Sequence, residues 1–475
     1  MNNLTMLTDL YQLTMLYGYF KNKKTERNSV FTMFFRDAPG LNYAVMAGNE
    51  QFLDYIRDLR FTEEDLKYLD SLNQFDRDFL DYLRTFRFTG NIDMVKEGSI
   101  IFPGEPIVRV EAPLAQAQLI ETTLLTLVGH QSLIATKAHR VCLAAEGGKV
   151  MEFGLRRAQG PDAGVLGARA AVIGGCSSTS NVLAGQMFGI PVSGTHAHSW
   201  VMSFDTELDA FRAYAQAFPN NALLLVDTYD TLRSGVPNAI KVFKELREQG
   251  HKPLGIRLDS GDLAYLSIMA RKMLDEAGFP EVIIVASNDL DETIIRDLKL
   301  QGAKIDLWGV GTKLITSFDR AAFGGVYKMN ALETDGKMVP KIKLSDNPIK
   351  VTLPGKQELY RLYTEDGMAA ADLVTLYDEK IDESQPLTIF DPVDTWKKMT
   401  LTNYKAVKML SPMVVDGQRV FEKESLKDIR ARREKQEATI WHQHLRLINP
   451  SAFKVDWSDK LWKLRSDMLH EQGKD

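Results

Sequence analysis

Six segments between Gly148 and Lys313 share one pattern, since each begins mostly apolar and ends in polar or glycine residues. Their ends recur mostly about thirty residues apart, which is the length of a strand plus a helix. Near-continuous apolar strands that alternate with helices are typical of a parallel sheet covered on both faces. The segments are KVMEFGLRR, IPVSGTHAHS, ALLLVDTYDT, PLGIRLDSGD, VIIVASNDLD and IDLWGVGTK, with strand ends expected near Phe153, Thr195, Asp227, Asp259, Asn288 and Gly309.

Six such units in series favour a (β/α) barrel over an open sheet. A dinucleotide-binding sheet would carry G-x-G-x-x-G after its first strand, and this chain does not. Loops after the strands' C-terminal ends carry the chemistry of a parallel barrel, so the polar ends should meet at one mouth. The helices of the barrel are expected near 163–173, 179–188, 207–217, 236–249, 262–277 and 291–301.

The full length of 475 residues is too great for one ordinary core, so two or three domains are expected. We predict an α+β region over 1–147, the barrel over 148–335 and a C-terminal part over 336–475. The first region has helices near 4–21, 48–60, 63–72, 75–87 and 114–145, with strands at 30–36 and within 94–113. After Gly324 the alternation ends, and strand-like pieces at 326–333, 340–345, 358–363, 386–390 and 405–415 precede charged helices near 424–438 and 457–471.

Composition excludes several classes of protein. A net charge of −5 provides no basic field for nucleic acid. Two cysteines exclude a disulfide scaffold and a Cys-rich zinc module. The N-terminus lacks the basic region of a signal peptide, and no uninterrupted apolar span of 18 residues occurs, so we expect a soluble, cytoplasmic protein without membrane partners.

Charged and polar side chains gather at the expected mouth. Cations and carboxylates in such number are costly in a purely structural protein, because each must be paired or solvated. They indicate an enzyme with an anionic, phosphorylated and metal-bound substrate. The side chains are those of Arg156, Arg157, His196, His198, Asp227, Asp230, Arg257, Asp259, Asp262, Asn288, Asp289 and Lys313.

The segment RLDSGD places the fork donor Arg257 beside the carboxylates of Asp259 and Asp262. An Arg can hold a carboxylate or phosphate by two hydrogen bonds, and Asp side chains suit Mg²⁺ or sugar hydroxyls. The alternative is structural: Asp259 or Ser260 would cap the helix that begins near 262.

The segment GVGT closes the last clear strand of the run. Backbone N–H groups at Gly309, Gly311 and Thr312 can form an anion nest, and late barrel loops are the usual phosphate site. Gly324 and Gly325 can supply its other side. Lys313 permits a Schiff-base aldolase, although a counter-charge for phosphate is the simpler role.

His198 can be a general base, a structural hydrogen-bonding group or a phosphoryl acceptor. Asp227, at the next strand end, is well placed to orient it through one ring nitrogen. Phe153 and tyrosines of the first helix can sandwich a flat ring, although aromatic residues at helical spacing are more often core.

Several motifs together resemble the nicotinate phosphoribosyltransferase family over essentially the whole chain. They are TDLYQLTM (8–15), FGLRRAQGPDAG (153–164), GTHAHSWVMSF (194–204), VDTYDT (226–231), RLDSGDL (257–263) and SNDLDE (287–292). The resemblance implies a type II phosphoribosyltransferase fold, in which an irregular (β/α) barrel joins an α/β sandwich domain built from both ends of the chain. It also implies a homodimer with shared active sites.

The implied reaction joins nicotinate to 5-phosphoribosyl 1-pyrophosphate, giving nicotinate mononucleotide and pyrophosphate with coupled ATP hydrolysis, a salvage step toward NAD. His198 matches the family's autophosphorylated residue, whereas His196 falls at a variable position. Asp259 would stabilise cationic character at the anomeric carbon, while Mg²⁺ neutralises the leaving group. The resemblance implies Mg²⁺ held with pyrophosphate near Asp259 rather than a metal site made of protein alone.

The same resemblance assigns substrate-binding residues. Arg257 would engage the nicotinate carboxylate, while Phe153 and Tyr11, the latter from the partner subunit, would stack on the ring. Nicotinamide-using relatives carry an Asp where this chain has Thr179-Ser180-Asn181, so nothing there repels a carboxylate. Arg156, Thr195 and Asp289 complete the predicted substrate-binding set. Two cysteines cannot build the Cys-rich zinc element of some family members, so packing alone must stabilise the last hundred residues.

Three other functions stay open at this point. A nicotinamide or quinolinate phosphoribosyltransferase is the first, and quinolinate chemistry would release CO₂ without ATP. A barrel aldolase working through Lys313 is more remote. A catalytically inactive sensor of NAD precursors is the third, against which the intact set of His198, Asp227 and Asp259 argues.

Overall fold

The computed structural model describes residues 3–38, 40–345 and 352–472. Two compact units form, one from Met1–Leu133 with Ala322–Asp475 and the other from Ile134–Ala321. The unit boundaries lie at 133/134 and 321/322, whereas the sequence suggested 147/148 and 335/336. The first difference arises because α6 (Glu121–Ala144) is one continuous helix that belongs partly to each unit. Within the described residues, no helix combines the length and apolarity needed to cross a bilayer.

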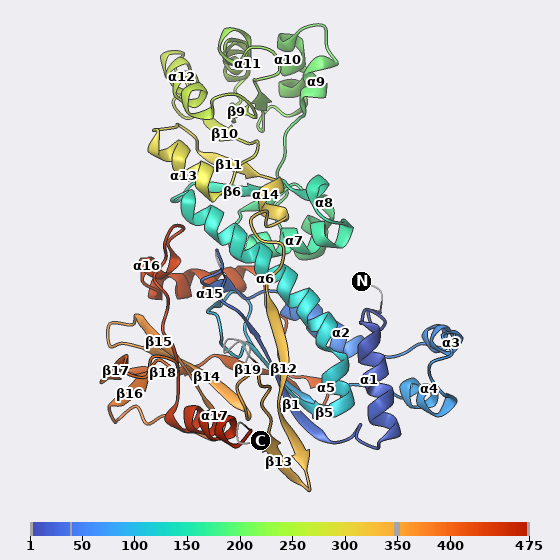
Figure 1. The fold of residues 1–475 in the computed structure, drawn as a ribbon. Helices are drawn as coiled ribbons and strands as arrows, with labels where there is room; N and C mark the ends of the chain where they lie inside the picture. Colours follow the sequence, from blue (N-terminus) through green and yellow to red (C-terminus); the bar gives the residue numbers. More distant parts are fainter. Residues whose placement is uncertain (1–2, 39, 346–351, 473–475) are drawn as a thin grey trace. The chain divides into compact units, whose positions relative to one another are not determined.

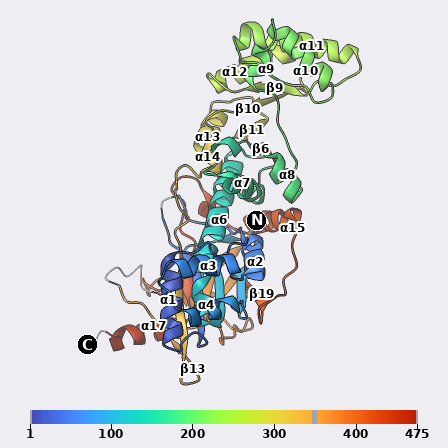
Figure 2. The ribbon, with the colours of Figure 1, turned by 90° about the vertical axis from the view of Figure 1, so that its right-hand side faces the viewer.

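The unit Ile134–Ala321 contains a parallel sheet of six short strands in the order β7-β6-β11-β10-β9-β8. Helices alternate with these strands, and α9 to α12 gather beside β9 (Figures 1 and 2). The strands are β6 (Lys149–Glu152), β7 (Ser178–Thr179), β8 (Leu223–Leu225), β9 (Gly255–Leu258), β10 (Ile283–Ala286) and β11 (Leu307–Val310). The helices are η1 (Leu155–Arg157), α7 (Pro161–Gly174), α8 (Val182–Phe188), α9 (His198–Met202), α10 (Glu207–Ala217), η2 (Thr231–Gly235), α11 (Val236–Glu248), α12 (Leu263–Glu276), α13 (Glu292–Leu300) and α14 (Thr312–Ile315).

The expected strand that ends near Thr195 is absent, and the short β7 takes its place in the sheet. The segment around Val192 still lies beside β7, because Thr179 N–H donates to Pro191 O at 3.1 Å and Ser193 N–H donates to Thr179 O at 3.0 Å. Pro191 has no backbone N–H to donate, and Gly194 has no side chain to pack against the sheet. The hydrogen bonding between this segment and β7 therefore ends after these two bonds.

Side chains connect the same segment to β8. The Thr195 hydroxyl donates to Leu223 O at 2.7 Å, and Leu225 N–H donates to the His196 Nε2 atom at 3.3 Å. The gap between β7 and β8 is thus bridged by backbone bonds on one side and side-chain bonds on the other. This mixed closure is why the barrel is irregular, as the fold prediction stated.

The other unit contains two larger sheets. A seven-stranded antiparallel sheet has the order β13-β12-β1-β5-β3-β19-β20, and a six-stranded mixed sheet has the order β17-β16-β21-β15-β14-β18. The first sheet comprises β1 (Asn28–Phe35), β3 (Asn91–Val95), β5 (Val108–Pro113), β12 (Gly325–Thr334), β13 (Lys337–Pro340), β19 (Leu410–Val415) and β20 (Gln418–Arg419). Its three central strands, β1, β5 and β3, come from the N-terminal part, and strands from after residue 324 flank them on both sides, which confirms a sandwich domain built from the N- and C-terminal parts.

The six-stranded sheet comes entirely from the C-terminal part. Its strands are β14 (Gln357–Tyr363), β15 (Ala369–Leu376), β16 (Leu387–Phe390), β17 (Lys398–Leu401), β18 (Lys405–Lys408) and β21 (Val455–Trp457). The strand expected over 405–415 is split at Met409, because β18 pairs with β14 while β19 pairs with β3 of the other sheet. The remaining elements are β2 (Ala44–Val45), β4 (Ile100–Ile101), α1 (Leu10–Lys21), α2 (Asn49–Asp58), α3 (Glu63–Ser71), α4 (Arg77–Arg84), α5 (Leu114–Leu119), α15 (Leu426–Thr439), α16 (His442–Leu445) and α17 (Asp459–Gln472).

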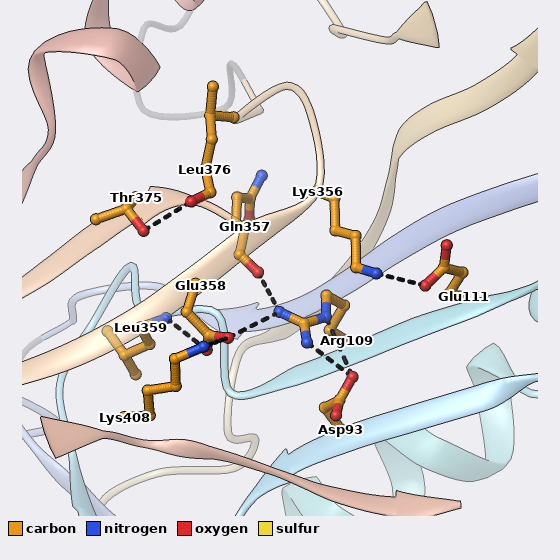
Figure 3. Close-up of polar contacts among 10 residues, drawn as sticks. All are labelled: Asp93, Arg109, Glu111, Lys356, Gln357, Glu358, Leu359, Thr375, Leu376 and Lys408. Atoms are coloured by element: carbon orange, nitrogen blue, oxygen red, sulfur yellow. Dashed lines mark hydrogen bonds and ion pairs between the residues drawn. The ribbon is translucent and has the colours of Figure 1, made fainter. Parts of the chain in front are cut away.

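Buried Arg109 of β5 connects the two sheets (Figure 3). Its guanidinium donates to Asp93 of β3 at 2.8 Å and to the carbonyl of Gln357 in β14, and it lies 3.6 Å from the Glu358 carboxylate. Lys356 and Glu111 form a second link at 2.6 Å. The register between the sheets is therefore fixed by charge pairs in addition to apolar packing.

A second buried cation, Arg361 of β14, is fully enclosed. It donates two parallel hydrogen bonds to Asp372 of β15, at 2.8 and 2.6 Å, and another to Ile100 O at 2.9 Å. Burial and the neighbouring Asp372 raise the pKa of Glu105 well above its usual range. Arg361 therefore supplies the positive charge beside the buried carboxyl groups of Asp372 and Glu105.

We expect Arg361→Met to lower the free energy of unfolding by about 3–5 kcal/mol, because Asp372 is then left buried without its cation. Urea unfolding followed by circular dichroism measures the change. The double variant R361M/D372L should be less destabilised than R361M, since removing both charges removes the unpaired one. A single variant within about 0.5 kcal/mol of the wild type would contradict this account.

Candidate functional site

A cleft of about 660 Å³ lies at the C-terminal ends of the barrel strands. It is lined by residues that follow β6, β9, β10 and β11 and by the segment that bridges β7 and β8. The convergence predicted from the strand ends is therefore present within this unit. The predicted residues that line the cleft are Phe153, Arg156, Arg157, Thr195, His196, His198, Arg257, Asp259, Asn288, Asp289, Gly309, Gly311 and Thr312.

His198 and Asp227 form a hydrogen-bonded pair at the cleft. His198 is the first residue of α9, and its Nε2 atom lies 3.1 Å from Asp227 Oδ1. The Asp227 side chain is 2% exposed, whereas that of His198 is 38% exposed. The carboxylate is thus held behind the imidazole, whose Nδ1 atom makes no hydrogen bond among the described residues. This is the arrangement expected of a carboxylate that orients a reactive histidine.

The other oxygen of Asp227 is held from the next strand end. Asp259 N–H and the Ser260 hydroxyl each donate to Asp227 Oδ2 at 2.7 Å. A buried carboxylate needs such donors, because desolvation penalises its charge. Ser260, which was considered only as a helix cap, therefore helps to position the carboxylate behind His198.

Arg257, Ser287 and Asp259 form a second network on the floor of the cleft. Arg257 Nε donates to Ser287 Oγ at 2.8 Å, Arg257 Nη2 donates to Asp259 Oδ1 at 3.0 Å, and Ser287 Oγ also donates to Asp259 Oδ1. These contacts leave Nη1 of Arg257 and Oδ2 of Asp259 without a hydrogen bond in the described part of the chain. Each group therefore keeps atoms with which to bind a ligand.

Sequence reasoning missed Ser287. It is buried at the end of β10 and fixes the side chains of two predicted site residues at once. The motif SNDLDE contains it, but only the following Asn288 and Asp289 were predicted to lie at the site. Asn288, the next residue, has a φ of 115°, a conformation that non-glycine residues rarely adopt. Such backbone strain is concentrated at functional sites.

Gly309 has a packing role besides the phosphate binding predicted for it, which stays a prediction. It lies inside β11, and an added Cβ would come within 2.7 Å of the Phe153 ring and 3.3 Å of Ser287. The missing side chain thus makes room for Phe153, whose ring also lies 5.9 Å from the Arg257 guanidinium. Gly311 and Thr312 follow the strand and line the cleft, and phosphate binding by this turn stays a prediction.

Arg156 and Arg157 are exposed in η1 at the rim of the cleft. Neither guanidinium forms an ion pair among the described residues. The cleft lining has two carboxylates, Asp259 and Asp289, and Asp259 is paired with Arg257 instead. The rim is therefore a place where an anion can be bound by free guanidinium groups.

His196 is buried beside the cleft and serves the fold. It accepts a hydrogen bond from Leu225 N–H and packs edge-on against Tyr214 at a centroid distance of 4.6 Å. Burial lowers the pKa of His196 to about 4, so the ring is neutral at physiological pH. Thr195 also uses its hydroxyl hydrogen within the fold, although it lines the cleft.

Three residues expected at the mouth have structural roles instead. Asp262 caps α12 by accepting from Tyr265 N–H at 3.0 Å, so the cap is Asp262 rather than Asp259 or Ser260. Asp230 caps η2, which leaves its carboxylate bonded to backbone N–H groups. Lys313 forms an ion pair with Asp291 at 2.6 Å and does not line the cleft. The carboxylates of Asp262 and Asp230 therefore stabilise helix ends, and the Lys313 ammonium stabilises an ion pair.

Of the other predicted residues, Tyr11, Gly324 and Gly325 belong to the sandwich unit, whereas Thr179, Ser180 and Asn181 belong to the barrel unit. Tyr11 is an exposed residue of α1, Gly325 begins β12, and Gly324 precedes it with a φ of 74°. Thr179 and Asn181 are buried: Thr179 donates to Glu152 at 2.6 Å and Asn181 caps α8, so Ser180 alone of the three faces the cleft. The roles predicted for Tyr11, Gly324 and Gly325 stay predictions.

The described residues contain no cluster of three or more His, Cys, Asp or Glu side chains able to hold a metal ion. Two carboxylates nevertheless face the cleft, those of Asp259 and Asp289. Mg²⁺ is usually bound through one or two carboxylates together with substrate phosphates and water. The residues present fit that kind of shared magnesium site.

Comparisons with known proteins agree along the chain. Residues 6–129 match the model of the nicotinate phosphoribosyltransferase N-terminal domain, 148–379 that of the nicotinate phosphoribosyltransferase family, and 356–465 that of the C-terminal domain. The nicotinate phosphoribosyltransferase of Bacillus subtilis (strain 168) is 47% identical over 472 residues, with 99% of this chain and 96% of the relative covered. That of Homo sapiens is 34% identical over 527 residues, covering 98% and 97%.

Solved structures give the same result. The crystal structure of human nicotinic acid phosphoribosyltransferase has a TM-score of 0.86 at 32% identity, covering 97% of this chain and 99% of that one. The nicotinate-nucleotide pyrophosphorylase from Pyrococcus furiosus shares the fold, with a TM-score of 0.71 at 22% identity over 92% and 96%. The irregular barrel, its cleft and the sandwich domain define a type II phosphoribosyltransferase. Within that class, the chain belongs to the nicotinate phosphoribosyltransferase family, and it is an enzyme.

We expect stability to fall as the pH decreases from 6.5 toward 4, because His196 then binds a proton in the unfolded chain but not in the folded one. Between pH 7 and pH 5 the loss in free energy of unfolding should be about 2 kcal/mol. Urea unfolding at both pH values measures it. His196→Gln should reduce this pH dependence, whereas the matched His442→Gln, at an exposed position, should leave it unchanged. An equal slope in H196Q and the wild type would contradict the assignment.

Proposed function

We propose that this enzyme transfers the phosphoribosyl group of 5-phosphoribosyl 1-pyrophosphate to nicotinate, with ATP hydrolysis coupled through a phosphohistidine at His198. The products are nicotinate mononucleotide and pyrophosphate. The observation that carries the proposal is the combination, in one cleft, of the His198–Asp227 pair with the network of Arg257, Ser287 and Asp259. Family membership supports the reaction as a whole.

The phosphoryl group would be accepted by Nδ1 of His198. Asp227 occupies Nε2 and, as a hydrogen-bond acceptor, favours the tautomer in which Nε2 carries the proton. Nδ1 then keeps its lone pair for attack on the terminal phosphate of ATP, and the bond to ADP breaks. Asp227 also compensates the positive charge that develops on the ring. The free energy of ATP is thereby available to change the affinity of the enzyme for its substrates.

Arg257 would bind the carboxylate of nicotinate. Its Nη1 group makes no hydrogen bond among the described residues, while Nε donates to Ser287 and Nη2 to Asp259, so the guanidinium is held in one orientation. The Phe153 ring beside it provides a flat apolar surface for the pyridine ring. Ser180 is uncharged and faces the same cleft, so no carboxylate there repels the substrate.

Asp259 would stabilise the anomeric carbon as the bond to pyrophosphate breaks and positive charge develops on the ribose. Asp259 and Asp289 would also hold Mg²⁺ together with the leaving pyrophosphate. When bound, the ion supplies positive charge that neutralises pyrophosphate. Arg156 and Arg157 at the rim, with the turn at Gly311 and Thr312, would bind the phosphate groups.

The proposed active enzyme is a cytoplasmic homodimer. Tyr11 lies on α1 with 48% of its surface exposed. Stacking of this ring on nicotinate in the partner's cleft would explain its exposure. A barrel aldolase has less support, since the Lys313 amine is bound in an ion pair, and the family matches support nicotinate rather than nicotinamide or quinolinate as the substrate.

Incubation with γ-labelled ATP is the direct test of the coupled mechanism. Acid-labile label should appear on the wild type and be absent from His198→Ala, while His251→Ala, which removes a histidine outside the cleft, should retain it. Label that persists in H198A would refute phosphorylation at this residue. Hydrolysis of ATP without any nicotinate-dependent product would refute the proposed transfer.

Arg257→Ala should lower kcat/KM for nicotinate by on the order of 100-fold or more, because it removes a charge-assisted contact with the carboxylate. Arg257→Lys is the matched variant, since it keeps the charge but loses the planar fork, and it should recover only part of the rate. Circular dichroism should show both variants folded. Wild-type nicotinate kinetics in R257A would contradict the assigned role.

A further inference from the structure

A second cavity, of about 950 Å³, lies in the sandwich unit. The turn between β14 and β15, strand β18 and helix α15 form its walls. None of the short sequence motifs quoted above, from TDLYQLTM to SNDLDE, falls on these elements, and the proposed reaction does not use them. Helix α15, one of the two charged helices predicted near the C-terminus, is rich in Lys and Arg.

The charge of this cavity is strongly one-sided. Five cations line it, Lys96, Lys405, Lys408, Arg432 and Lys435, against one carboxylate, that of Glu365. The chain as a whole carries a net charge of −5, so the cavity differs in sign from its protein. Cations converging on a concave surface favour an anionic ligand, because like charges repel each other until an anion neutralises them.

Two of these cations are already neutralised. Lys408 lies 3.3 Å from Glu358, and Arg432 donates to Glu424 at 2.9 Å. These pairs fix the two side chains at the wall. They do not account for the other three lysines.

Lys96, Lys405 and Lys435 make no ion pair within the described residues. Lys405 and Lys435 are exposed, and the Lys96 ammonium lies 5.3 Å from the centroid of the Phe421 ring. The three come from separate parts of the chain: Lys96 follows β3, Lys405 begins β18 and Lys435 belongs to α15. Three unpaired ammonium groups around one cavity correspond to the charge of a phosphate chain rather than a single phosphate.

The rest of the lining is suited to a ring. Tyr363, Tyr404, Val407 and Met409 provide aromatic and apolar surface. The Tyr404 hydroxyl donates to Asp382 O at 3.0 Å, which fixes the position of its ring. Aromatic and apolar surface beside a few charged groups is typical of sites for small organic ligands, and a nucleotide fits a cavity of this size.

We propose that this cavity binds a nucleotide with two or more phosphates, at a site formed by residues other than those of the barrel cleft. Lys96, Lys405 and Lys435 contact the phosphates, and the tyrosines contact the base. A volume of about 950 Å³ suits a single nucleotide, so a nucleic acid strand is not the ligand inferred.

Equilibrium dialysis with radiolabelled ADP tests the proposal, because ADP cannot phosphorylate the enzyme and turnover does not complicate the measurement. The pocket variant K405E/K435E should bind one fewer ADP per chain than the wild type, with at least a ten-fold loss of affinity at that site. K460E/K463E is the matched control, since it makes the same charge change on exposed lysines of α17, outside the cavity. It should bind as the wild type does.

The pocket variant should also keep wild-type nicotinate transfer, so failure of this proposal and failure of the proposed function are distinguishable. Equal ADP binding by K405E/K435E and the wild type would overturn the site. An equal loss in K460E/K463E would overturn it too, since the effect would then be general electrostatics. Inorganic tripolyphosphate that competes at this site as tightly as ADP binds would overturn the nucleotide assignment in favour of a bare phosphate chain.

Discussion

The buried carboxylate of Asp227 is the interaction on which the geometry of the cleft depends. One of its oxygens holds His198 at the start of α9, and the other accepts hydrogen bonds from the backbone of Asp259 and the hydroxyl of Ser260. Three segments of chain therefore meet on one charged group. Because a carboxylate with almost no exposure is stable only when its donors are in place, the positions of these segments are coupled.

A second network supplies the rest of the site by the same principle. Ser287 receives a hydrogen bond from Arg257 and donates one to Asp259, so an uncharged hydroxyl sets the orientation of two charged groups. Gly309 leaves the space in which Phe153 lies beside that arginine. The residues proposed to contact substrate are therefore preorganised by neighbours that do not react, which is how binding geometry is maintained in enzymes.

The sandwich unit shows how charge can be either compensated or left available. Arg109 and Arg361 are buried, and each is paired with carboxylates that tie strands together. Lys405 and Lys435, around the second cavity, have no such partner in the described residues. The first arrangement stabilises a fold, whereas the second leaves free ammonium groups, and this contrast is the basis for the nucleotide site.

The sequence by itself determined the alternation of apolar strands and helices, and hence the parallel barrel with its polar strand ends at one mouth. That pattern is local, since each strand end is visible as apolar residues followed by Asp, Asn or Gly. It therefore predicted the lining positions of Arg257, Asp259 and His198.

Only the tertiary structure decided which polar residues serve chemistry and which serve the fold. His196 and Thr195 replace a missing strand ladder, Asp262 and Asp230 cap helices, and Lys313 is ion-paired. Ser287 and the cavity lysines acquire their roles from neighbours distant in sequence. The sequence specifies the type and charge of each side chain. Its burial and its partners depend on contacts between segments far apart along the chain, and those contacts form only in the folded structure.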